Sequence, residues 1–322
     1  MEDKYLLSIC IPTYNRADYL KQCLDNIVRQ FGDKKIKDSI EIVISDNASK
    51  DNTENLAKEY QSRWDNIKYF RNEKNLGPDE NMINSVLKAE GRYCWTIGDD
   101  DFIQNGGLNF IISSLEKKPV SLLTINFNPF IDLDACAKKI ENIDEKLLMY
   151  FDSPEKFWSD GYCQGIFGIL IFNKKLWLEI DRNNYEKLWA YYEIILKMIA
   201  RSDLPLAHIN YPLAFIGQDY RWNENGTALL VSVNFKKLLD KLTDYGYSKK
   251  FINTKKLIIA KSLPTAILSA KSYGLKCSFS NLKLIYKNFY NYPIYVFATA
   301  LIFFIPNTIV KKLKSIKNKL KK

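Results

Sequence analysis

The feature that most constrains this chain is the alternation of short apolar runs with helix-patterned segments through residues 1–127. The runs "LLSICI" at 6–11, "IEIVIS" at 40–45 and "YCWTIG" at 93–98 are nearly continuous in apolar side chains, as expected of strands buried on both faces. Further elements are predicted as strands at 67–72 and 120–127 and a helix at 107–117. Strands and helices that alternate with short connections predict a parallel sheet with helices on both faces.

Polar residues follow three of the predicted strands at the point where each strand ends. Residues 12–16, "PTYNR", follow the first strand, residues 46–51, "DNASKD", the second, and residues 99–101, "DDD", the fourth. Ligands of parallel α/β sheets bind at the carboxyl ends of the strands, so we expect the three segments to meet in one site. Asn15 is expected to cap the helix that follows the first segment.

Three carboxylates stand side by side at Asp99, Asp100 and Asp101. Like charges at this distance repel one another, so we expect a cation to neutralise the cluster. Mg²⁺ and Mn²⁺ take oxygen ligands and often bridge one or two carboxylates to a substrate diphosphate. In an extended segment Asp99 and Asp101 point to the same side, which makes them the expected metal ligands. The alternative is a solvated acidic turn after a strand.

Asp46, at the end of the second strand, is a further binding candidate. Its carboxylate can accept hydrogen bonds from a base or from ribose hydroxyls, whereas the alternative is a residue that closes a turn or caps a helix, a role that suits Asp51 better. Other site types are missing, because the sequence has no GxxxxGK[ST], no GxGxxG after the first strand and no GxSxG. These absences disfavour P-loop enzymes, dinucleotide-binding proteins and serine hydrolases.

The single histidine and the six cysteines limit the chemistry further. His208 lies in a strand-like run and is expected to be structural, so proton transfer should fall to Asp or Glu. The cysteines form no CxxC pair and are expected to be buried thiols in a reducing compartment. The N-terminal residues lack the basic region and cleavage site of a secretory signal, so we expect the body of the protein to be cytoplasmic.

The net charge of +10 is unevenly distributed. Of the 47 basic residues, 14 are lysines within residues 255–322, which contain no acidic residue and no Arg. The other 254 residues therefore carry 33 basic and 37 acidic side chains. A mildly acidic body with a strongly basic end predicts a polyanionic partner, either a membrane surface or a nucleic acid.

Four segments, taken in order, resemble the successive sequence blocks of the family 2 glycosyltransferases. They are "SICIPTYNRADYLKQCLDNIVRQ", "EIVISDNASKDNT", "NLGPDENMINSVLKAEGRYCWTIGDDD" and "FGILIFNKKLW". The resemblance covers about residues 5–220. It implies the GT-A fold, a nucleotide-binding α/β domain with a DXD metal motif, in an enzyme of the kind that builds bacterial surface glycans.

The resemblance also implies roles for individual residues. The positions that match the family's nucleotide-sugar site are Pro12, Thr13, Tyr14, Arg16, Asp46, Asn75, Gly77, Asp99 and Asp100. Among them Asp46 matches the acid that recognises the base, typically uracil. Asp99 and Asp101 match the two ends of the DXD motif, the first beside the ribose and diphosphate and the second on the metal, which would be Mn²⁺ or Mg²⁺.

Family members that invert the anomeric carbon use a general base, usually the Asp of a "Glu-Asp" pair on a later helix. The segment "WAYYEIILKMI" falls where that helix is expected, and Glu193 aligns with the base because Leu196 follows at the family's spacing. The pair itself is absent, since Tyr192 replaces the first acid and Glu replaces Asp. Asp219 is the fallback base. The alternative for Glu193 is a charge on the solvent-facing side of a helix.

The organisation that follows is a GT-A domain at residues 1–230 and a helical, basic region at 231–322. The nucleotide-binding half is expected at about 1–127 and the acceptor half at about 128–230. The later elements are expected as strands at 166–172 and 204–216 and a helix at 184–200.

The end of the chain predicts contact with a membrane. Residues 294–310, "IYVFATALIFFIPNTIV", are apolar for about twelve residues and precede "KKLKSIKNKLKK", whereas a spanning helix needs about 20 apolar residues. We therefore expect residues 294–322 to lie in the cytoplasmic leaflet, with the lysines on anionic head groups. The alternatives are a buried core helix and a spanning helix.

Together these features favour an inverting, metal-dependent glycosyltransferase bound peripherally to the inner face of the cell membrane. It would use a nucleotide-sugar, most simply a UDP-sugar, and a lipid-linked or surface-glycan acceptor. One alternative is a non-catalytic, membrane-bound module that binds nucleotide or glycan and assists a partner enzyme, because the Glu-Asp pair is missing. The other is a nucleic-acid-binding protein, but the apolar "FATALIFFI" favours a membrane, so no nucleic acid is expected.

Overall fold

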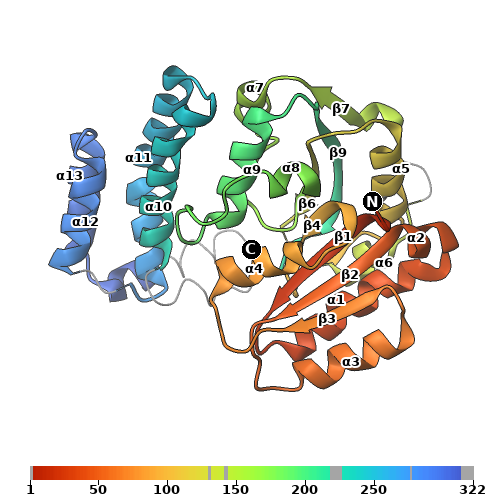
Figure 1. The fold of residues 1–322 in the computed structure, drawn as a ribbon. Coiled ribbons are helices and arrows are strands. Elements are labelled where there is room, and N and C mark those ends of the chain that lie inside the picture. The colour runs from red at the N-terminus through yellow and green to blue at the C-terminus, as the bar shows by residue number, and fades with distance from the viewer. Residues whose placement is uncertain (1–2, 130–131, 141–143, 218–226, 276–277, 313–322) are drawn as a thin grey trace. The chain divides into compact units, whose positions relative to one another are not determined.

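The computed structural model describes most of the chain, namely residues 3–129, 132–140, 144–217, 227–275 and 278–312 (Figure 1). The contacts divide the chain into two compact units. The first comprises residues 1–184 and 190–218, and the second comprises residues 185–189 and 219–322.

The first unit is built on one sheet. Its strands are β1 (Tyr5–Thr13), β2 (Ile40–Asp46), β3 (Ile67–Arg71), β4 (Gly91–Thr96), β5 (Phe102–Ile103), β6 (Leu122–Asn128), β7 (Leu148–Phe151), β8 (Leu170–Asn173) and β9 (Leu206–Phe215). Their order is β3-β2-β1-β4-β8-β6-β9-β5, and β7 pairs with β9. β5, β7 and β8 run antiparallel to their neighbours, whereas the others share one direction. The predicted, mostly parallel sheet is confirmed.

The central strands β1 and β2 show why the sequence has unbroken apolar runs. All seven residues of β2 are buried, and β1 is buried from Leu7 to Ile11. A strand that is covered on both faces must place apolar side chains on both, which removes the alternating pattern of a half-exposed strand. The register sets Ile9 opposite Ile42 and Thr13 opposite Asp46, so the two strands end at the same level.

Helices cover both faces of this sheet. They are α1 (Ala17–Val28), α2 (Lys34–Ser39), α3 (Thr53–Arg63), α4 (Pro78–Leu87), α5 (Gly107–Lys117), α6 (Leu133–Ala137), α7 (Pro154–Ser159), α8 (Lys174–Leu178) and α9 (Ala190–Arg201), with 3₁₀ turns η1 (Arg29–Gly32) and η2 (Glu145–Leu147). α4 packs on β1 and β2 and against α9, while α1 packs against α3. α9 begins at Ala190, later than the expected start at residue 184.

The start of α1 differs from the prediction. Its N-cap residue is Arg16, and Asn15 instead adopts the left-handed conformation with φ of 53°. The carboxylate of Asp51 accepts the N–H of Ala17 at 3.0 Å, so an acid from the next strand-end segment satisfies the helix terminus. The expectation that Asn15 caps the helix was wrong because a long-range partner took the place of a local one.

The second unit is helical. It contains α10 (Thr227–Leu242), η4 (Thr243–Tyr245), α11 (Lys249–Ser272), α12 (Phe279–Phe289) and α13 (Pro293–Phe303). Its core includes the buried side chains of Leu238, Leu263, Ile267 and Phe289. The helical C-terminal extension that the sequence predicts is confirmed. Within the described residues, no helix combines the length and the hydropathy that a membrane span requires.

Candidate active site

The carboxyl ends of β1, β2 and β4 lie side by side in the first unit (Figure 1). In the register of these strands Thr13 stands opposite Asp46, and Cys10 stands opposite Thr96, the last residue of β4. The chain then turns into Asp99, whose Oδ2 accepts a hydrogen bond of 2.7 Å from the hydroxyl of Thr13. The ends of β1 and β4 therefore meet, as the alternation predicts.

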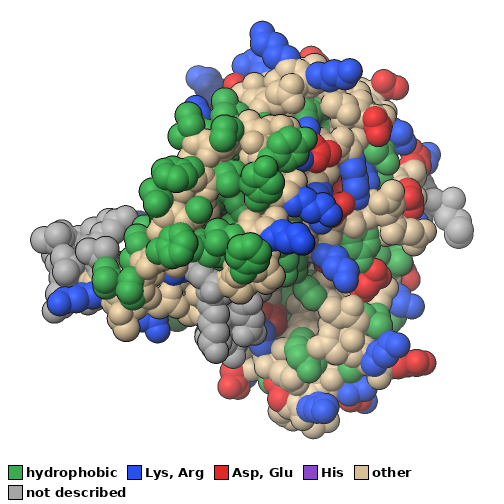
Figure 2. Space-filling view, turned by 90° about the vertical axis from the view of Figure 1, so that its left-hand side faces the viewer, with side chains coloured by type: hydrophobic (Ala, Val, Ile, Leu, Met, Phe, Trp, Pro, Cys, Tyr) green, Lys and Arg blue, Asp and Glu red, His purple; other side chains and the backbone are tan. Residues whose placement is uncertain are grey.

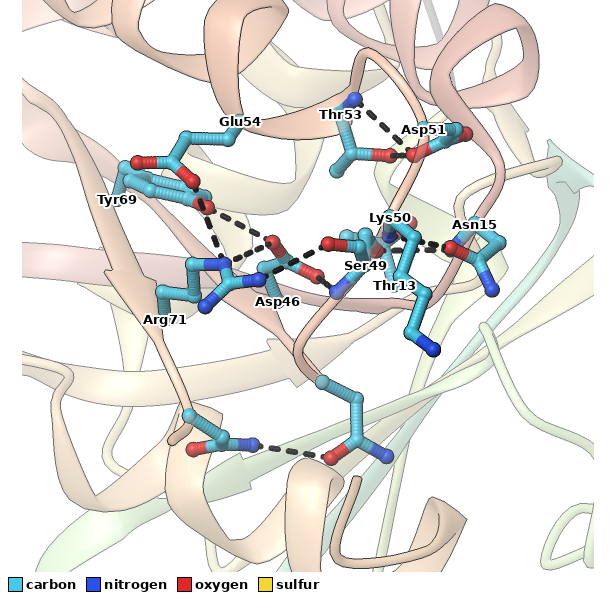
Figure 3. Close-up of polar contacts among 12 residues, drawn as sticks. Thr13, Asn15, Asp46, Ser49, Lys50, Asp51, Thr53, Glu54, Tyr69 and Arg71 are labelled. Carbon is cyan, nitrogen blue, oxygen red and sulfur yellow. Dashed lines mark hydrogen bonds and ion pairs between the residues drawn. The ribbon is translucent and has the colours of Figure 1, made fainter. Parts of the chain in front are cut away.

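The first and second strand-end segments are joined as well, through Asn15 and Ser49 (Figure 3). The backbone N–H of Asn15 donates to the hydroxyl of Ser49 at 2.8 Å, and Oδ1 of Asn15 accepts the N–H of Lys50 at 2.7 Å. Within the first segment Tyr14 is exposed and Pro12 is half-buried. All three predicted segments thus belong to one site.

Arg16 neutralises part of the acidic cluster. Its Nε lies 2.8 Å from Oδ1 of Asp99, and its Nη2 lies 2.9 Å from Oδ2 of Asp100. Both oxygens of Asp99 are therefore engaged, one by Arg16 and the other by Thr13. Burial raises the pKa of Asp99 to about 6, although the charge of Arg16 and the hydrogen bond from Thr13 oppose the shift.

Asp101 is held by the backbone instead. Its Oδ2 accepts the N–H of Gly98 at 2.6 Å, and its Oδ1 accepts the N–H of Gly217 at 2.9 Å. Among the described residues, no Lys or Arg forms an ion pair with it. Burial raises the pKa of Asp101 to about 7; the hydrogen bond from Gly217 opposes this rise and the charge of Asp100 adds to it. Gly168 packs so closely that a Cβ there would lie 2.7 Å from Oδ2.

This cluster fits a divalent cation as its missing counter-charge. When ionised, three carboxylates and one guanidinium leave two negative charges, and oxygen atoms are the ligands that Mg²⁺ and Mn²⁺ prefer. Asp101 is the better placed ligand, because each of its oxygens gives one lone pair to a backbone N–H and keeps another. The solvated acidic turn does not hold, since Asp99 and Asp101 are only 5% and 4% exposed.

The protein does not by itself form a complete metal cage. In the part of the chain that the structure describes, no three His, Cys, Asp or Glu side chains converge as metal ligands. Arg16 already pairs with Asp99 and Asp100. A metal held here would therefore need oxygens from a bound ligand in addition to the carboxylates.

Asp46 lies at the centre of a buried polar network (Figure 3). Its Oδ1 accepts the N–H of Ser49 at 2.9 Å, and its Oδ2 accepts the hydroxyl of Tyr69 at 2.7 Å. Nε of Arg71 lies 3.6 Å from the same Oδ2 and 3.3 Å from Oε2 of Glu54. Asp46 therefore closes the turn that follows β2, as the alternative role expected. A carboxylate accepts about four hydrogen bonds, but Asp46 is fully buried, so a ligand would reach it only if one of these partners moved.

The loop before α4 is attached to the same strand ends. Nδ2 of Asn47 donates to Oδ1 of Asn75 at 2.9 Å and to the carbonyl of Gly77 at 3.1 Å, while its Oδ1 accepts the N–H of Leu76. Gly77 has a φ of 89°, a conformation that favours glycine, and Pro78 follows as the first residue of α4. Asn75 and Gly77 thus lie beside the end of β2, and their role in binding a nucleotide stays a prediction.

Glu193, the predicted base, is fully buried on α9. Its Oε1 lies 2.6 Å from Nζ of Lys197, one helical turn later, and Nζ also donates to the carbonyl of Asn184 at 3.0 Å. The alternative of a solvent-facing charge is therefore wrong. An acceptor hydroxyl would reach this carboxylate only if the pair opened, so the catalytic role of Glu193 stays a prediction. The fallback, Asp219, lies outside the described residues.

Several residues beside Asp101 were not predicted from the sequence. Tyr191, at the start of α9, donates its hydroxyl to the carbonyl of Gly165 at 2.6 Å, and its pKa is raised by burial, with smaller contributions from Cys163 and Asp101. Gly168 leaves no room for a Cβ beside the carboxylate of Asp101, and the N–H of Gly217 donates to that carboxylate. Gly168 and Gly217 lie 67 and 116 positions away from Asp101 in the sequence, so no local pattern could have indicated them.

Comparisons with known proteins show the family and the fold. The family model "Glycosyl transferase family 2" matches residues 8–175. The abequosyltransferase RfbV of Salmonella typhimurium is 30% identical over 257 residues, which cover 76% of each chain. A GalNAc(5)-diNAcBac-PP-undecaprenol beta-1,3-glucosyltransferase of Campylobacter jejuni is 34% identical over 112 residues, which cover 34% of this chain and 35% of that protein.

Solved structures share the fold at low sequence identity. Staphylococcus aureus TarS 1–349 in complex with UDP-GlcNAc has a TM-score of 0.61 and 13% identity, and the match covers 97% of this chain and 92% of that one. Mannosyltransferase PcManGT from Pyrobaculum calidifontis, in complex with GDP-Man and Mn²⁺, has a TM-score of 0.55 and 16% identity, covering 99% and 89%. The chain therefore belongs to glycosyltransferase family 2 and is a glycosyltransferase with the GT-A fold.

Proposed function

We propose that this glycosyltransferase transfers a sugar from a UDP-sugar to a hydroxyl of a lipid-linked or surface-glycan acceptor, with inversion and with a divalent metal. Transfer from a nucleotide-sugar is the activity of the family. The choice of a lipid-linked or surface-glycan acceptor is supported by the names of two relatives. One is an abequosyltransferase, and the other acts on a glycan linked to undecaprenol diphosphate. It is also supported by the UDP-GlcNAc bound to a structural neighbour.

The observation that carries the proposal is the cluster of Thr13, Arg16, Asp99, Asp100 and Asp101 at the carboxyl ends of β1 and β4. It has two negative charges in excess, most of it is buried, and it stands beside the end of β2, where Asp46 lies. A nucleoside diphosphate that carries a metal would supply both the missing positive charge and the missing oxygen ligands.

The donor would be bound as follows. Asp101, with Asp99, would hold Mn²⁺ or Mg²⁺. When bound, the metal would stabilise the negative charge on the leaving nucleoside diphosphate. Asp46 would accept a hydrogen bond from the base with its remaining lone pairs, while Ser49 and Tyr69 keep its carboxylate in one orientation. Asn75 and Gly77 would form a further wall of the nucleotide site, and Arg16 would turn from the carboxylates to the diphosphate.

Glu193 would take the proton from the acceptor hydroxyl, with Asp219 as the other candidate. A carboxylate in this role must come within about 3 Å of the hydroxyl, either directly or through one water molecule. Lys197 would then have to release Glu193 when the acceptor binds. The acceptor itself would be presented at the cytoplasmic face of an anionic membrane, to which the lysine-rich end of the chain would bind.

The reaction can be tested by measuring release of free UDP from a panel of UDP-sugars with purified lipid-linked glycans as acceptors. We expect release that needs both donor and acceptor, stops with EDTA and returns with Mn²⁺. The anomeric configuration of the product then tests inversion. Release that persists in EDTA would contradict the metal. Nucleotide binding with no release on any acceptor would favour a non-catalytic module.

A further inference from the structure

The helices α12 and α13 expose a continuous set of large apolar side chains. Seven residues, each 54–83% exposed, form what we call the α12–α13 face: Phe279, Tyr286, Tyr290, Ile294, Phe297, Leu301 and Phe304. On α13 they recur at intervals of three and four residues, which places them on one side of the helix. Figure 2 looks at the side on which Figure 1 draws these helices, and hydrophobic side chains gather there with Lys and Arg around them.

The opposite side of each helix is packed within the second unit. Ile285 and Phe289 of α12 and Thr299 and Phe303 of α13 are buried. Nζ of the buried Lys271 donates to the carbonyl of Phe303 at 3.1 Å and so satisfies the C-terminal end of α13. The exposed face is therefore held in a fixed orientation by the packed side.

Charge identifies the partner of this face. Lys283 and Lys287 on α12 and Lys311 and Lys312 after α13 are exposed, and residues 255–322 contain no acidic side chain. Exposed aromatic side chains surrounded by lysines are typical of helices that lie at the boundary between lipid head groups and acyl chains. A second copy of the chain is a poorer partner, because a two-fold contact would bring the two lysine clusters together.

We propose that the α12–α13 face lies in the surface of an anionic lipid bilayer, with its apolar side chains among the acyl chains and its lysines on the head groups. α13 has 11 residues and so is about 16 Å long, roughly half the thickness of the hydrocarbon core, which fits a helix parallel to the surface. This inference specifies the membrane partner in the proposed function, but it does not depend on the transfer reaction.

The face can be tested with point substitutions. Truncation before α13 is unsuitable because it would also expose the side of α11 against which α13 packs. The variant Ile294→Ser/Phe297→Ser/Phe304→Ser removes three exposed side chains and no buried one. Its matched control, Leu87→Ser/Leu133→Ser/Leu178→Ser, removes three exposed leucines of the first unit. The full-length proteins are floated with phosphatidylcholine vesicles, with and without phosphatidylglycerol.

We expect wild type and control to float with the anionic vesicles and the α13 variant to lose about a hundredfold in partition coefficient. Because each Lys near an anionic surface contributes about fivefold, Lys283→Gln/Lys287→Gln should lower binding by roughly 25-fold and weaken the preference for phosphatidylglycerol. Circular dichroism melting checks that every variant is folded. If the α13 variant does not fold, the vesicle binding of the Lys283→Gln/Lys287→Gln variant decides whether the face binds an anionic membrane.

The proposal would be overturned by equal flotation of the α13 variant and wild type, or by wild type that binds neither vesicle. It would also be overturned if sedimentation velocity showed that wild type is a dimer and the α13 variant a monomer, while wild type bound no vesicles. The face would then join two copies of the chain. UDP release on a soluble acceptor, measured in parallel, separates a failure of this inference from a failure of the transferase proposal.

Discussion

At the scale of single residues, Asp99 and Asp101 are neighbours with different partners. Arg16 and Thr13 engage Asp99, whereas only backbone N–H groups reach Asp101 among the described residues. A buried carboxylate with no cationic partner is costly when ionised, and this cost is what raises the pKa of Asp101 to about 7. A metal bound as proposed would recover this cost, so we expect Asp101 to be the residue most sensitive to metal and to pH.

The raised pKa gives a prediction for stability without metal. Asp101 binds a proton more tightly in the folded state than in the unfolded state, where its pKa is about 3.9. Its stabilising contribution is therefore complete below about pH 4 and lost as the pH rises through about 7. Between about pH 5 and pH 8, Asp101→Asn should gain on the order of 3 kcal/mol in unfolding free energy relative to wild type.

Denaturant melts of both proteins at the two pH values measure this difference. The comparison cancels titrating groups that are remote from Asp101, such as His208, whose pKa burial lowers to about 4. Asp65→Asn serves as the control, because Asp65 is an exposed acid just before β3, away from the carboxyl ends of the strands. If the unfolding free energies of Asp101→Asn and wild type differed by the same amount at both pH values, the pKa of Asp101 would not be raised in the folded state.

The buried pair of Glu193 and Lys197 gives a second prediction. Glu193→Gln removes the carboxylate charge that faces the buried ammonium of Lys197, so it should cost about 3–5 kcal/mol of stability. It should also lower turnover by about 10²–10⁴-fold if Glu193 is the base. The double variant Glu193→Gln/Lys197→Met removes both charges, so its melting temperature should recover while its turnover stays low. If the double variant recovered turnover together with stability, the pair would have a structural role, and Asp219 would become the candidate base.

At the scale of elements, the segment between α7 and β8 brings Gly168 against the carboxylate of Asp101. Gly168 has a φ of 91°, its N–H donates to the carbonyl of Thr96, and its own carbonyl accepts Nε1–H of Trp95. These bonds to β4 leave no freedom for the segment to move away. The tight turn before β8, the strand next to β4, therefore helps to fix the position of Asp101.

Gly168→Ala should accordingly lose more than stability. The left-handed φ alone costs about 1–2 kcal/mol for Ala, and the new Cβ would also displace Asp101 and with it metal-dependent UDP binding. Gly161→Ala is the matched control, because Gly161 has a φ of 88° and open space around its Cβ position. Both variants should melt lower, but only the first should fail to gain stability from UDP with Mn²⁺. Equal gains would contradict a close contact at Gly168.

Elements with a regular pattern could be predicted from the sequence, whereas some of the short ones could not. β1, β2, β4 and α5 lie at or within two residues of their expected positions, because buried runs and helical spacing are local signals. β5 and β7 were missed, since two and four residues carry no period. Of the site, Thr13, Asp46 and Asp99 were predictable as residues at strand ends. The turns that bring Gly168 and Gly217 to Asp101 depend on long-range contacts.

At the scale of the whole molecule, the chain combines a mildly acidic catalytic unit with a basic helical unit. The first collects carboxylates at the ends of parallel strands, where Arg16 neutralises only part of their charge. The second exposes apolar and cationic side chains together. The sequence predicted the charge asymmetry and the apolar tail, but not that α13 is packed on one side and exposed on the other, because its apolar residues surround the helix.

The central claim is that a metal–nucleotide complex binds at Asp101. Isothermal titration of UDP into protein with Mn²⁺, with EDTA in place of Mn²⁺, and into the Asp101→Asn and Asp65→Asn variants tests it most directly. We predict binding by wild type and by Asp65→Asn with Mn²⁺ only, and a loss of at least about 100-fold in affinity for Asp101→Asn, since a buried charge-to-metal contact is removed. Metal-independent binding of UDP, or unchanged affinity in Asp101→Asn, would contradict the account.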